Sequence, residues 1–357
     1  MNKRTLKNRC LRIAASIFAI SFCVSIASIL CNHPYDNAEK TVNSFYNQSD
    51  KKLDYIFIGA SSVVYNVNPT IIYHESGLMG CCLSIDAAAG GVYVSMLDEV
   101  KNKYEDVVLL VDAEGLVFDN EINIKNSNRI WIDTMEKNKN WLNSICRLDY
   151  SNRLEHYIPI LRYHSNLPRF YAYLPQIKQD YINKKNKTAD IMHGANVMTK
   201  RITEIHPNET YHFFVPEDLE ESQPSKNVEE NINEFIELCN QSNFKDVIFI
   251  DSPKICFDSE HIKELNRTYS LLLYLKRIVR ENGYTFLESS GIETINECDI
   301  DISDYADTTH LNVYGAKKLS CFYADFLISN YKFEQKNELA IEKWNADAFE
   351  MYKRYDL

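Results

Sequence analysis

The chain has 357 residues and a mass of 41.6 kDa, enough to bury the core of one large domain or two small ones. Hydrophobic residues make up 45% and charged residues 25%, which excludes a disordered, collagen-like or many-span membrane protein. The net charge of −11 argues against nucleic acid as a partner, because phosphate binding needs a basic surface.

The first 31 residues differ from the rest of the chain. Five Lys and Arg residues precede Ile13, no acidic residue occurs before Asp36, and residues 13–31 are uncharged and mostly apolar. A helix of that length nearly crosses a hydrocarbon core of about 30 Å. Residues 1–31 are therefore predicted to form a cytoplasmic basic flank and a single transmembrane anchor in the cell membrane, which places the following domain outside the cell. A cleaved signal peptide is the alternative, although Ser25-Ile26-Ala27 matches its cleavage site poorly.

Residues 32–52 are rich in Asn, Ser and Lys and are predicted to form a polar stem. After them, short apolar runs that end in Gly or an acidic residue alternate with helical patterns. The runs cover residues 53–59, 107–111, 247–250 and 284–287, and the helical patterns cover 70–76, 93–104, 228–241, 260–282 and 315–329. This alternation predicts an α/β domain over residues 53–330, in which helices cover both faces of a parallel sheet.

Two regions depart from the alternation. Residues 120–225 contain Trp131, Trp141 and many Tyr, and we interpret them as a mostly helical insertion. Its aromatic residues suit a cap over a carbohydrate-sized cleft, or they serve packing alone. Residues 331–357 are predicted to form a helical tail. The cysteines lack a C-x-x-C pair, and no P-loop or Gly-x-Gly-x-x-Gly is present, so no metal or cofactor is expected.

A serine follows the first predicted strand in the sequence Gly59-Ala60-Ser61-Ser62. In a parallel sheet, ligands bind beyond the carboxyl ends of the strands, so a hydroxyl here is exposed where backbone N–H groups can stabilise an oxyanion. Ser61 is therefore a candidate nucleophile. The alternative is an ordinary turn in which Ser61 or Ser62 caps a helix.

A serine nucleophile needs a histidine base that is oriented by a carboxylate. The spacing Asp-x-x-His occurs at Asp307–His310, Asp190–His193 and Asp258–His261, so the spacing alone is not specific. Only His310 follows the last strand-like run and leads into a closing helix, which can return it to the end of the first strand. His193 lies in the insertion and His261 starts a long helix, so both are predicted to be structural or solvated.

The Gly-x-Ser after the first strand and the late Asp-x-x-His-Leu-Asn-x-x-Gly-Ala, residues 307–316, resemble the SGNH/GDSL hydrolase superfamily. The resemblance covers about residues 53–119 and 244–330. Gly59-Ala60-Ser61-Ser62 looks especially like membrane-anchored bacterial members, including the D-alanine-transfer proteins of teichoic acid systems. Within the insertion, residues 157–164 resemble a stretch in uncharacterised exported members from Gram-positive bacteria. The resemblance implies a three-layer, flavodoxin-like fold with Ser61 as nucleophile, His310 as base and Asp307 as its orienting carboxylate.

The resemblance is incomplete at the oxyanion hole. Members of the superfamily place a Gly after the second strand and an Asn after the third. Gly90 and Gly91 can fill the first role, but Asp112-Ala113-Glu114 offers no Asn, and an ionised Asp cannot donate a hydrogen bond. We therefore expect the oxyanion to be bound by backbone N–H groups of Ser61 or Ser62 and of Gly90 or Gly91.

These features predict an extracytoplasmic serine esterase or O-acyltransferase that forms an acyl-enzyme. A cell-envelope glycan or an acylated carrier is the expected substrate, because the anchor holds the domain at the outer face of the membrane. Two other functions stay open. The first is a non-catalytic envelope-binding protein on a degenerate SGNH fold, and the second is a partner of a membrane acyltransferase.

Overall fold

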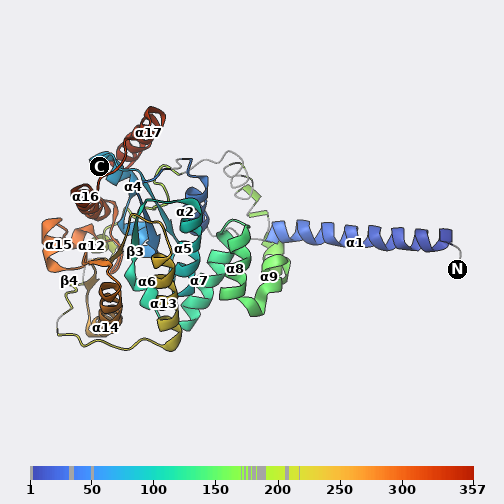
Figure 1. The fold of residues 1–357 in the computed structure, drawn as a ribbon, viewed down its shortest axis with the longest axis horizontal. Helices are drawn as coiled ribbons and strands as arrows, with labels where there is room; N and C mark the ends of the chain where they lie inside the picture. Colours follow the sequence, from blue (N-terminus) through green and yellow to red (C-terminus); the bar gives the residue numbers. More distant parts are fainter. Residues whose placement is uncertain are drawn as a thin grey trace.

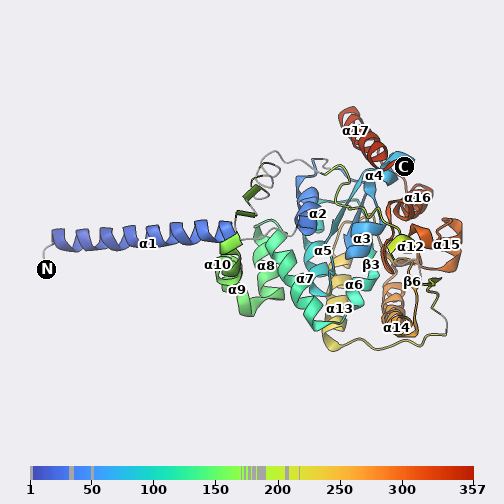
Figure 2. The ribbon, with the colours of Figure 1, turned by 180° about the vertical axis from the view of Figure 1, so that it is seen from behind.

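The computed structural model describes residues 3–31, 36–49, 52–169, 171–172, 174–175, 178, 182, 190–205, 209–216 and 218–357. Within them the chain forms an α/β domain and one helix that projects from it (Figures 1 and 2). The projecting helix is α1 (Lys3–Cys31). Its segment Asn8–Ser28 is long and apolar enough to cross a membrane, and within that segment only the last residue, Ser28, is buried.

The domain is built on a parallel five-stranded sheet in the order β2-β1-β3-β5-β7. The strands are β1 (Tyr55–Gly59), β2 (Gly80–Ser84), β3 (Val108–Asp112), β5 (Asp246–Ile250) and β7 (Thr285–Leu287). A separate two-stranded antiparallel sheet pairs β4 (His212–Phe213) with β6 (Ile255–Cys256). Because β1 is second in the order and pairs with β2 and β3, the residues that follow β1 lie beside the ends of both neighbours.

Helices cover both faces of the parallel sheet, as the alternating pattern predicts. One face packs against α5 (Gly91–Lys103) and α13 (Lys226–Asn240). The other packs against α3 (Ser61–Asn66), α4 (Pro69–Ser76) and α16 (Val313–Asn330). The α/β domain also contains α6 (Ala113–Val117), α14 (Ser259–Glu281), α15 (Ile292–Glu297) and the 3₁₀ turn η3 (Ile302–Asp304).

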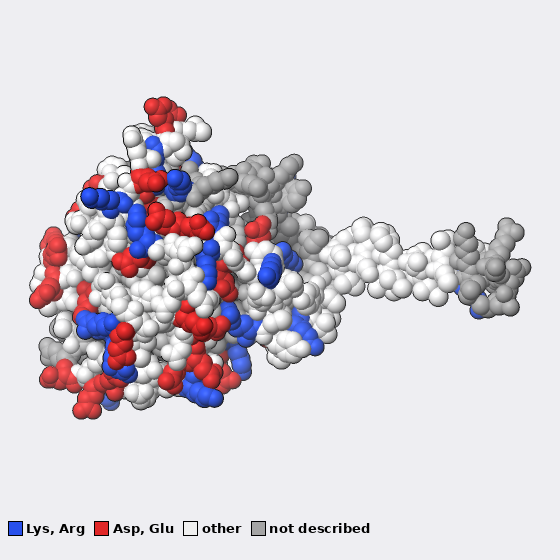
Figure 3. All heavy atoms as spheres, in the orientation of Figure 1, with Lys and Arg blue, Asp and Glu red and all other residues white. Residues whose placement is uncertain are grey.

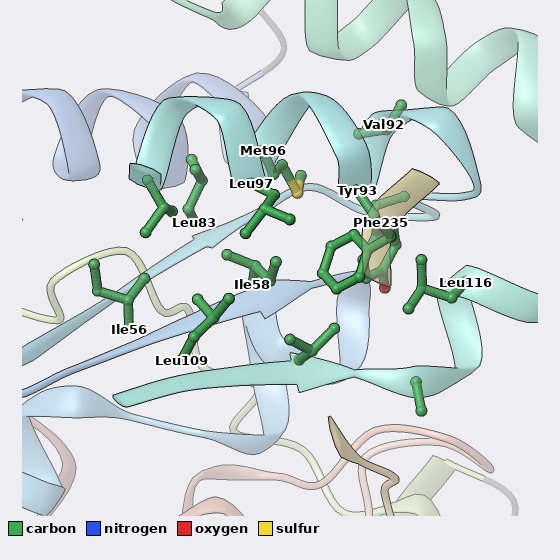
Figure 4. Packing of buried hydrophobic residues seen from close by; sticks show 14 of the residues in the cluster. Ile56, Ile58, Leu83, Val92, Tyr93, Met96, Leu97, Leu109, Leu116 and Phe235 are labelled. Carbon is green, nitrogen blue, oxygen red and sulfur yellow. The ribbon is translucent and has the colours of Figure 1, made fainter. Parts of the chain in front are cut away.

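Alternating side chains of β1 fill the two cores, because successive residues of a strand point to opposite faces. Ile56 and Ile58 belong to the core beneath α5, whereas Tyr55 and Phe57 belong to the opposite core. Figure 4 shows Ile58 and Leu109 pointing toward Met96 and Leu97 of α5. A strand that is buried on both faces has to be continuously apolar, which explains the runs seen in the sequence.

Each of the four predicted runs overlaps one strand of the sheet, and the five predicted helices correspond to α4, α5, α13, α14 and α16. The edge strand β2 was not predicted. Its sequence Gly80-Cys81-Cys82-Leu83-Ser84 has no β-branched or aromatic residue, so no apolar run marks it. Gly80 is required by close packing, since a Cβ there would lie 2.2 Å from two ring atoms of Tyr55.

The prediction of a polar stem over residues 32–52 is wrong for most of its length. Residues 36–47 form helix α2 (Asp36–Asn47), which packs on the domain. Ala38, Val42 and Phe45 are buried in the core, and their spacing of four and three residues places them on one helix face. The abundance of Asn, Ser and Lys on the other faces hid this pattern.

The insertion is mostly helical in its described part. It contains α7 (Glu121–Thr134), α8 (Lys139–Leu148), α9 (Arg153–Tyr157), α10 (Ile160–Tyr163), α12 (Ile202–Ile205), and the 3₁₀ turns η1 (Tyr150–Asn152) and η2 (His164–Arg169). Trp131 and Trp141 are buried, so these two aromatic residues pack in the core. The predicted tail contains α17 (Glu338–Tyr355), which is helical as expected but docks on the domain through Trp344 and Met351.

Candidate active site

The turn after β1 places Ser61 at the start of α3, directly beyond the carboxyl end of the strand. Gly59 is needed for this turn because a Cβ there would lie 2.5 Å from Val63 Cγ2 and 2.6 Å from Asp112 Cβ. The tight approach brings the end of β3 against the turn. Ser61 lines a cavity of about 310 Å³.

Asp112, the last residue of β3, holds this turn in place. Its Oδ2 accepts hydrogen bonds from Ala60 N at 3.1 Å, Ser62 Oγ at 2.6 Å and Tyr93 Oη at 3.0 Å. Its Oδ1 accepts from Glu114 N at 3.2 Å. The residues on both sides of Ser61 are thus bonded to one buried carboxylate. The Ser62 hydroxyl donates to Asp112, whereas the Ser61 hydroxyl faces His310.

His310 joins Ser61 and Asp307 in one hydrogen-bonded chain. His310 Nε2 lies 2.8 Å from Ser61 Oγ, and His310 Nδ1 lies 2.7 Å from Asp307 Oδ2. An ionised carboxylate only accepts, so Nδ1 carries the proton of a neutral ring and Nε2 is free to accept from the serine hydroxyl. The structure thus brings the three residues singled out in the sequence into the geometry of a nucleophile, a base and an orienting carboxylate.

The carboxylate of Asp307 is held in its ionised form. Partial burial favours the neutral acid, but the hydrogen bond from His310, the favourable electrostatic interaction with its ring, and the N–H groups of Thr309 and His310 outweigh burial and lower the pKa of Asp307 to about 2. Those two N–H groups donate to Oδ1 at 2.8 Å each, which leaves Oδ2 for the imidazole. Asp307 therefore stays charged at neutral pH and orients the ring.

Asn66 was not predicted, yet it ties the Ser61 helix to the His310 loop. It ends α3 and is fully buried. Its Nδ2 donates to Thr309 O at 3.2 Å, and its Oδ1 accepts from Leu311 N at 2.7 Å. One side-chain amide thus satisfies the backbone on both sides of His310. No sequence signal marks Asn66, because its partners lie 243 and 245 residues away along the chain.

A buried ion pair forms part of the cavity wall. Lys254 Nζ lies 2.7 Å from Glu114 Oε2, with side-chain exposures of 6% and 15%. Burial raises the pKa of Glu114, and the nearby ammonium opposes that rise. An ion pair at such depth is costly to desolvate, which makes it a candidate for substrate contact. Glu114 directly follows the third strand and could have been considered from the sequence, but nothing there marks Lys254.

The prediction that Gly90 or Gly91, after the second strand, donates to the oxyanion needs correction. The N–H of Gly90 donates to Gly115 O at 3.1 Å, so it is already engaged in this structure. Gly91 begins α5, does not line the Ser61 cavity and packs toward Leu148, which would lie 2.7 Å from a Cβ at position 91. Ala87 and Ala88 line the cavity instead. The N–H of Ser62, in the first turn of α3, remains a predicted donor.

The other two Asp-x-x-His pairs do not join the triad. His193 is fully buried and stacks on Trp344 with ring centroids 3.6 Å apart, which fits the structural role predicted for it. His261 lies in the first turn of α14 and lines the Ser61 cavity, a position that its sequence context did not reveal. Its carboxylate neighbour Asp258 accepts from the N–H groups of Glu260 and His261 as a helix cap.

A second cavity of about 760 Å³ adjoins Asp307 and Thr308. Tyr211, Phe257 and Ile202 are among the residues that line it, so it combines aromatic and aliphatic surface beside the triad. Among the described residues, no group of three or more His, Cys, Asp or Glu side chains is arranged to hold a metal ion. The site as described consists of protein side chains and two adjoining cavities.

Comparison with known proteins adds no relative to this description. No protein-family model matches the chain, and no curated protein matches it significantly. The assignment of function therefore depends on the site geometry and on the resemblance of its motifs to the SGNH/GDSL superfamily.

Proposed function

We propose that this protein is a serine esterase or O-acyltransferase of the SGNH type. The observation that carries the proposal is the continuous chain from Ser61 Oγ through both nitrogens of His310 to Asp307, at 2.8 and 2.7 Å. This arrangement suits a nucleophile whose proton passes to a neutral imidazole. The position of Ser61 beyond the end of β1 in a parallel α/β sheet supports a flavodoxin-like SGNH fold.

In the proposed reaction, His310 takes the proton of Ser61 while the serine oxygen attacks an ester carbonyl. A tetrahedral intermediate forms, and the N–H of Ser62 is the expected donor to its oxyanion. His310 then gives the proton to the leaving alcohol, and an acyl-enzyme remains on Ser61. Water or a sugar hydroxyl next attacks the acyl-enzyme with His310 again as base, which gives hydrolysis or transfer.

The proposed substrate is an acyl ester of a cell-envelope glycan or an acylated carrier. The N-terminal helix α1 supports this, because the five basic residues before Ile13 favour a cytoplasmic amino terminus and a domain outside the cell. The cavity beside Asp307 also supports it, since Tyr211 and Phe257 offer aromatic surface where a sugar can stack. Protease added to wall-stripped cells should digest the domain, whereas full protection would contradict this location.

A fluorophosphonate probe tests the chemistry directly. The wild-type protein should be labelled, Ser61→Ala should abolish labelling, and Ser62→Ala is the matched control because its hydroxyl is bonded to Asp112 rather than to His310. Circular dichroism should show both variants folded. Labelling that persists in Ser61→Ala and disappears in Ser62→Ala would assign the nucleophile to the neighbouring residue.

A second candidate is a non-catalytic envelope-binding protein on the same fold. Two observations favour it: Asp112 stands where the superfamily has a donor Asn, and the N–H of Gly90 is engaged by Gly115. Both features reduce the number of oxyanion donors. A folded wild-type protein that resists the probe under all conditions would favour this function over catalysis.

A further inference from the structure

Four exposed apolar side chains follow one another along the insertion. Tyr150, Leu154, Tyr157 and Leu161 are 58%, 62%, 50% and 51% exposed. Tyr150 lies on η1, Leu154 and Tyr157 lie three residues apart on α9, and Leu161 lies on α10. The backbone leaves the helical conformation at Ile158 (φ −129°, ψ 77°), so the four residues belong to consecutive short turns and not to one continuous helix. We call these four residues the apolar stripe. A stripe of large apolar residues on a water-facing surface is unusual.

The side of this segment that faces the domain carries charged groups, and Tyr157 also packs edge-on against the buried Trp141, with ring centroids 5.3 Å apart. His156 is buried and lies 3.2 Å from Asp133 Oδ1 and 2.8 Å from Asp149 Oδ2. Arg162 bonds Asp149 and Glu155, at 3.0 and 2.6 Å. The segment thus turns His156 and Arg162 inward and leaves Leu154 and Leu161 outward, which reverses the pattern of a helix between a core and water. The reversed pattern fits a segment whose outer surroundings are lipid.

The segment also lies where a bilayer surface would be. Helices α10 and η2 pack against α1, and Ile160 N donates to Ser28 Oγ at 3.3 Å. Ser28 is the last residue of the apolar span Asn8–Ser28. Figure 2 shows α9 and α10 beside the end of α1, on the side from which that helix projects, and Figure 1 shows α9 in the same place. A bilayer crossed by this span would have its domain-side surface at the level of α10.

The residue types suit the interfacial zone of a bilayer. Tyrosine concentrates at membrane–water interfaces, leucine inserts its side chain among acyl chains, and a nearby cation attracts lipid phosphate. Arg153 supplies that cation, with its guanidinium 4.2 Å from the ring centroid of Tyr150. In Figure 3 the described surface next to α1 is mostly uncharged, with patches of Lys and Arg and a smaller patch of Asp or Glu.

We infer that the apolar stripe is a lipid-binding surface that lies in the bilayer interface beside the outer end of α1. The inference rests on the proposed insertion of α1 into the membrane and extends it. Two contacts, one spanning and one interfacial, fix the tilt of the domain. The Ser61 cavity is then held in one orientation above the bilayer instead of swinging on a single helix.

Tryptophan quenching in the full-length protein tests this surface. The protein is reconstituted in phosphatidylcholine and phosphatidylglycerol vesicles with acyl chains brominated near the glycerol end. Single substitutions add a reporter: Leu161→Trp on the stripe, Phe18→Trp within α1, and Leu339→Trp as a matched exposed leucine on α17. Phe18 and Leu339 are 73% and 77% exposed, whereas the native Trp131, Trp141 and Trp344 are buried and give a background that the parent protein measures.

The stripe predicts that Leu161→Trp gains at least about half of the quenching increment of Phe18→Trp, because interfacial side chains reach the upper acyl chains. Leu339→Trp should gain none. Quenching of Phe18→Trp with Leu161→Trp equal to Leu339→Trp would overturn the lipid-binding surface and leave the anchor intact. Absence of quenching at both Phe18→Trp and Leu161→Trp would overturn the anchor as well. Quenching at Leu161→Trp alone would support the stripe and overturn the spanning role of α1.

Discussion

His310 and His193 each follow an aspartate by three residues, but their surroundings differ completely. His310 is 17% exposed, borders the Ser61 cavity and has one ring nitrogen on Asp307 and the other on Ser61. His193 has no exposed side-chain surface and stacks on Trp344. Its Nδ1 lies 2.9 Å from Gln48 Nε2, and its Nε2 lies 3.2 Å from Asp347.

The difference lies in what the aspartate does and in what faces the far ring nitrogen. Asp307 bonds its own histidine, whereas the Asp190 carboxylate lies 3.3 Å from Lys40. A histidine becomes a base only when a nucleophile faces one nitrogen and a carboxylate fixes the other. The Asp-x-x-His spacing can place a carboxylate beside the histidine, but it cannot place a nucleophile. Whether a nucleophile faces the other nitrogen depends on which strand end the fold brings next to the imidazole ring.

The largest effect is expected for His310→Ala. It removes the proton acceptor of Ser61, so the rate of probe labelling should fall by about 10³-fold or more, as for the loss of a triad member. His193→Ala is the matched control and should leave the labelling rate of the folded fraction unchanged. Equal losses of rate in both folded variants would contradict the distinction between the two histidines.

Asn66→Ala should sharpen the comparison, because it disturbs the position of His310 without touching its ring. The variant removes both hydrogen bonds that flank His310, so the imidazole loses its fixed distance to Ser61. A misplacement of about 1 Å costs on the order of 100-fold in rate, and we expect a loss of about 10–100-fold in labelling rate. Unfolding by urea should be measured in parallel. An unchanged rate in the folded variant would show that other contacts suffice to place His310.

Much of the fold was predictable because buried parallel strands must be apolar on both faces. Residues 107–111 and 247–250 were found for that reason and became β3 and β5. The strand β2 was missed because Gly80 and two cysteines carry no strand signal. The prediction of a polar stem was wrong because Val42 and Phe45 do not stand out among the many polar residues around them. Both residues are nevertheless buried in the core.

The three triad residues were predictable because two short motifs carry them. Within the second motif, Gly315 is explained by packing, since a Cβ there would lie 2.5 Å from Asp304 O. Asn312 caps α16 by accepting from the N–H groups of Tyr314 and Gly315. Lys254 and His261 could not be found, because only the packing of α14 and the residues after β5 brings them to the cavity.

The pH dependence of the free energy of unfolding should reveal the contribution of the buried His193. Burial lowers the pKa of His193 below its usual 6.5, although Asp347 and Asp190 favour the charged form. As the pH falls below 6.5, the imidazole of His193 is therefore protonated in the unfolded chain before it is protonated in the folded chain. The free energy of unfolding decreases as a result. His193→Phe should remove this contribution, which is at most about 1.4 kcal/mol per pH unit. Urea unfolding at pH 7 and pH 5 measures it, and an identical pH dependence in both proteins would refute it.

The smallest effect is expected for Asp258→Ala, which tests the third Asp-x-x-His pair. Asp258 Oδ1 accepts from Glu260 N at 3.0 Å and His261 N at 2.7 Å, so it caps α14. Loss of such a cap costs about 1 kcal/mol of folding free energy, and Asp258→Asn should retain most of it because asparagine also accepts in this position. Helix α14 continues for 23 residues beyond the cap, so the cavity wall formed by His261 and Leu265 should persist.

Urea unfolding measures the loss of stability in Asp258→Ala. The rate of probe labelling should change by less than about three-fold, since no proton transfer depends on this carboxylate. A loss of labelling as large as that of His310→Ala, in a folded variant, would mean that Asp258 and His261 take part in the chemistry and that the cavity holds a second functional pair.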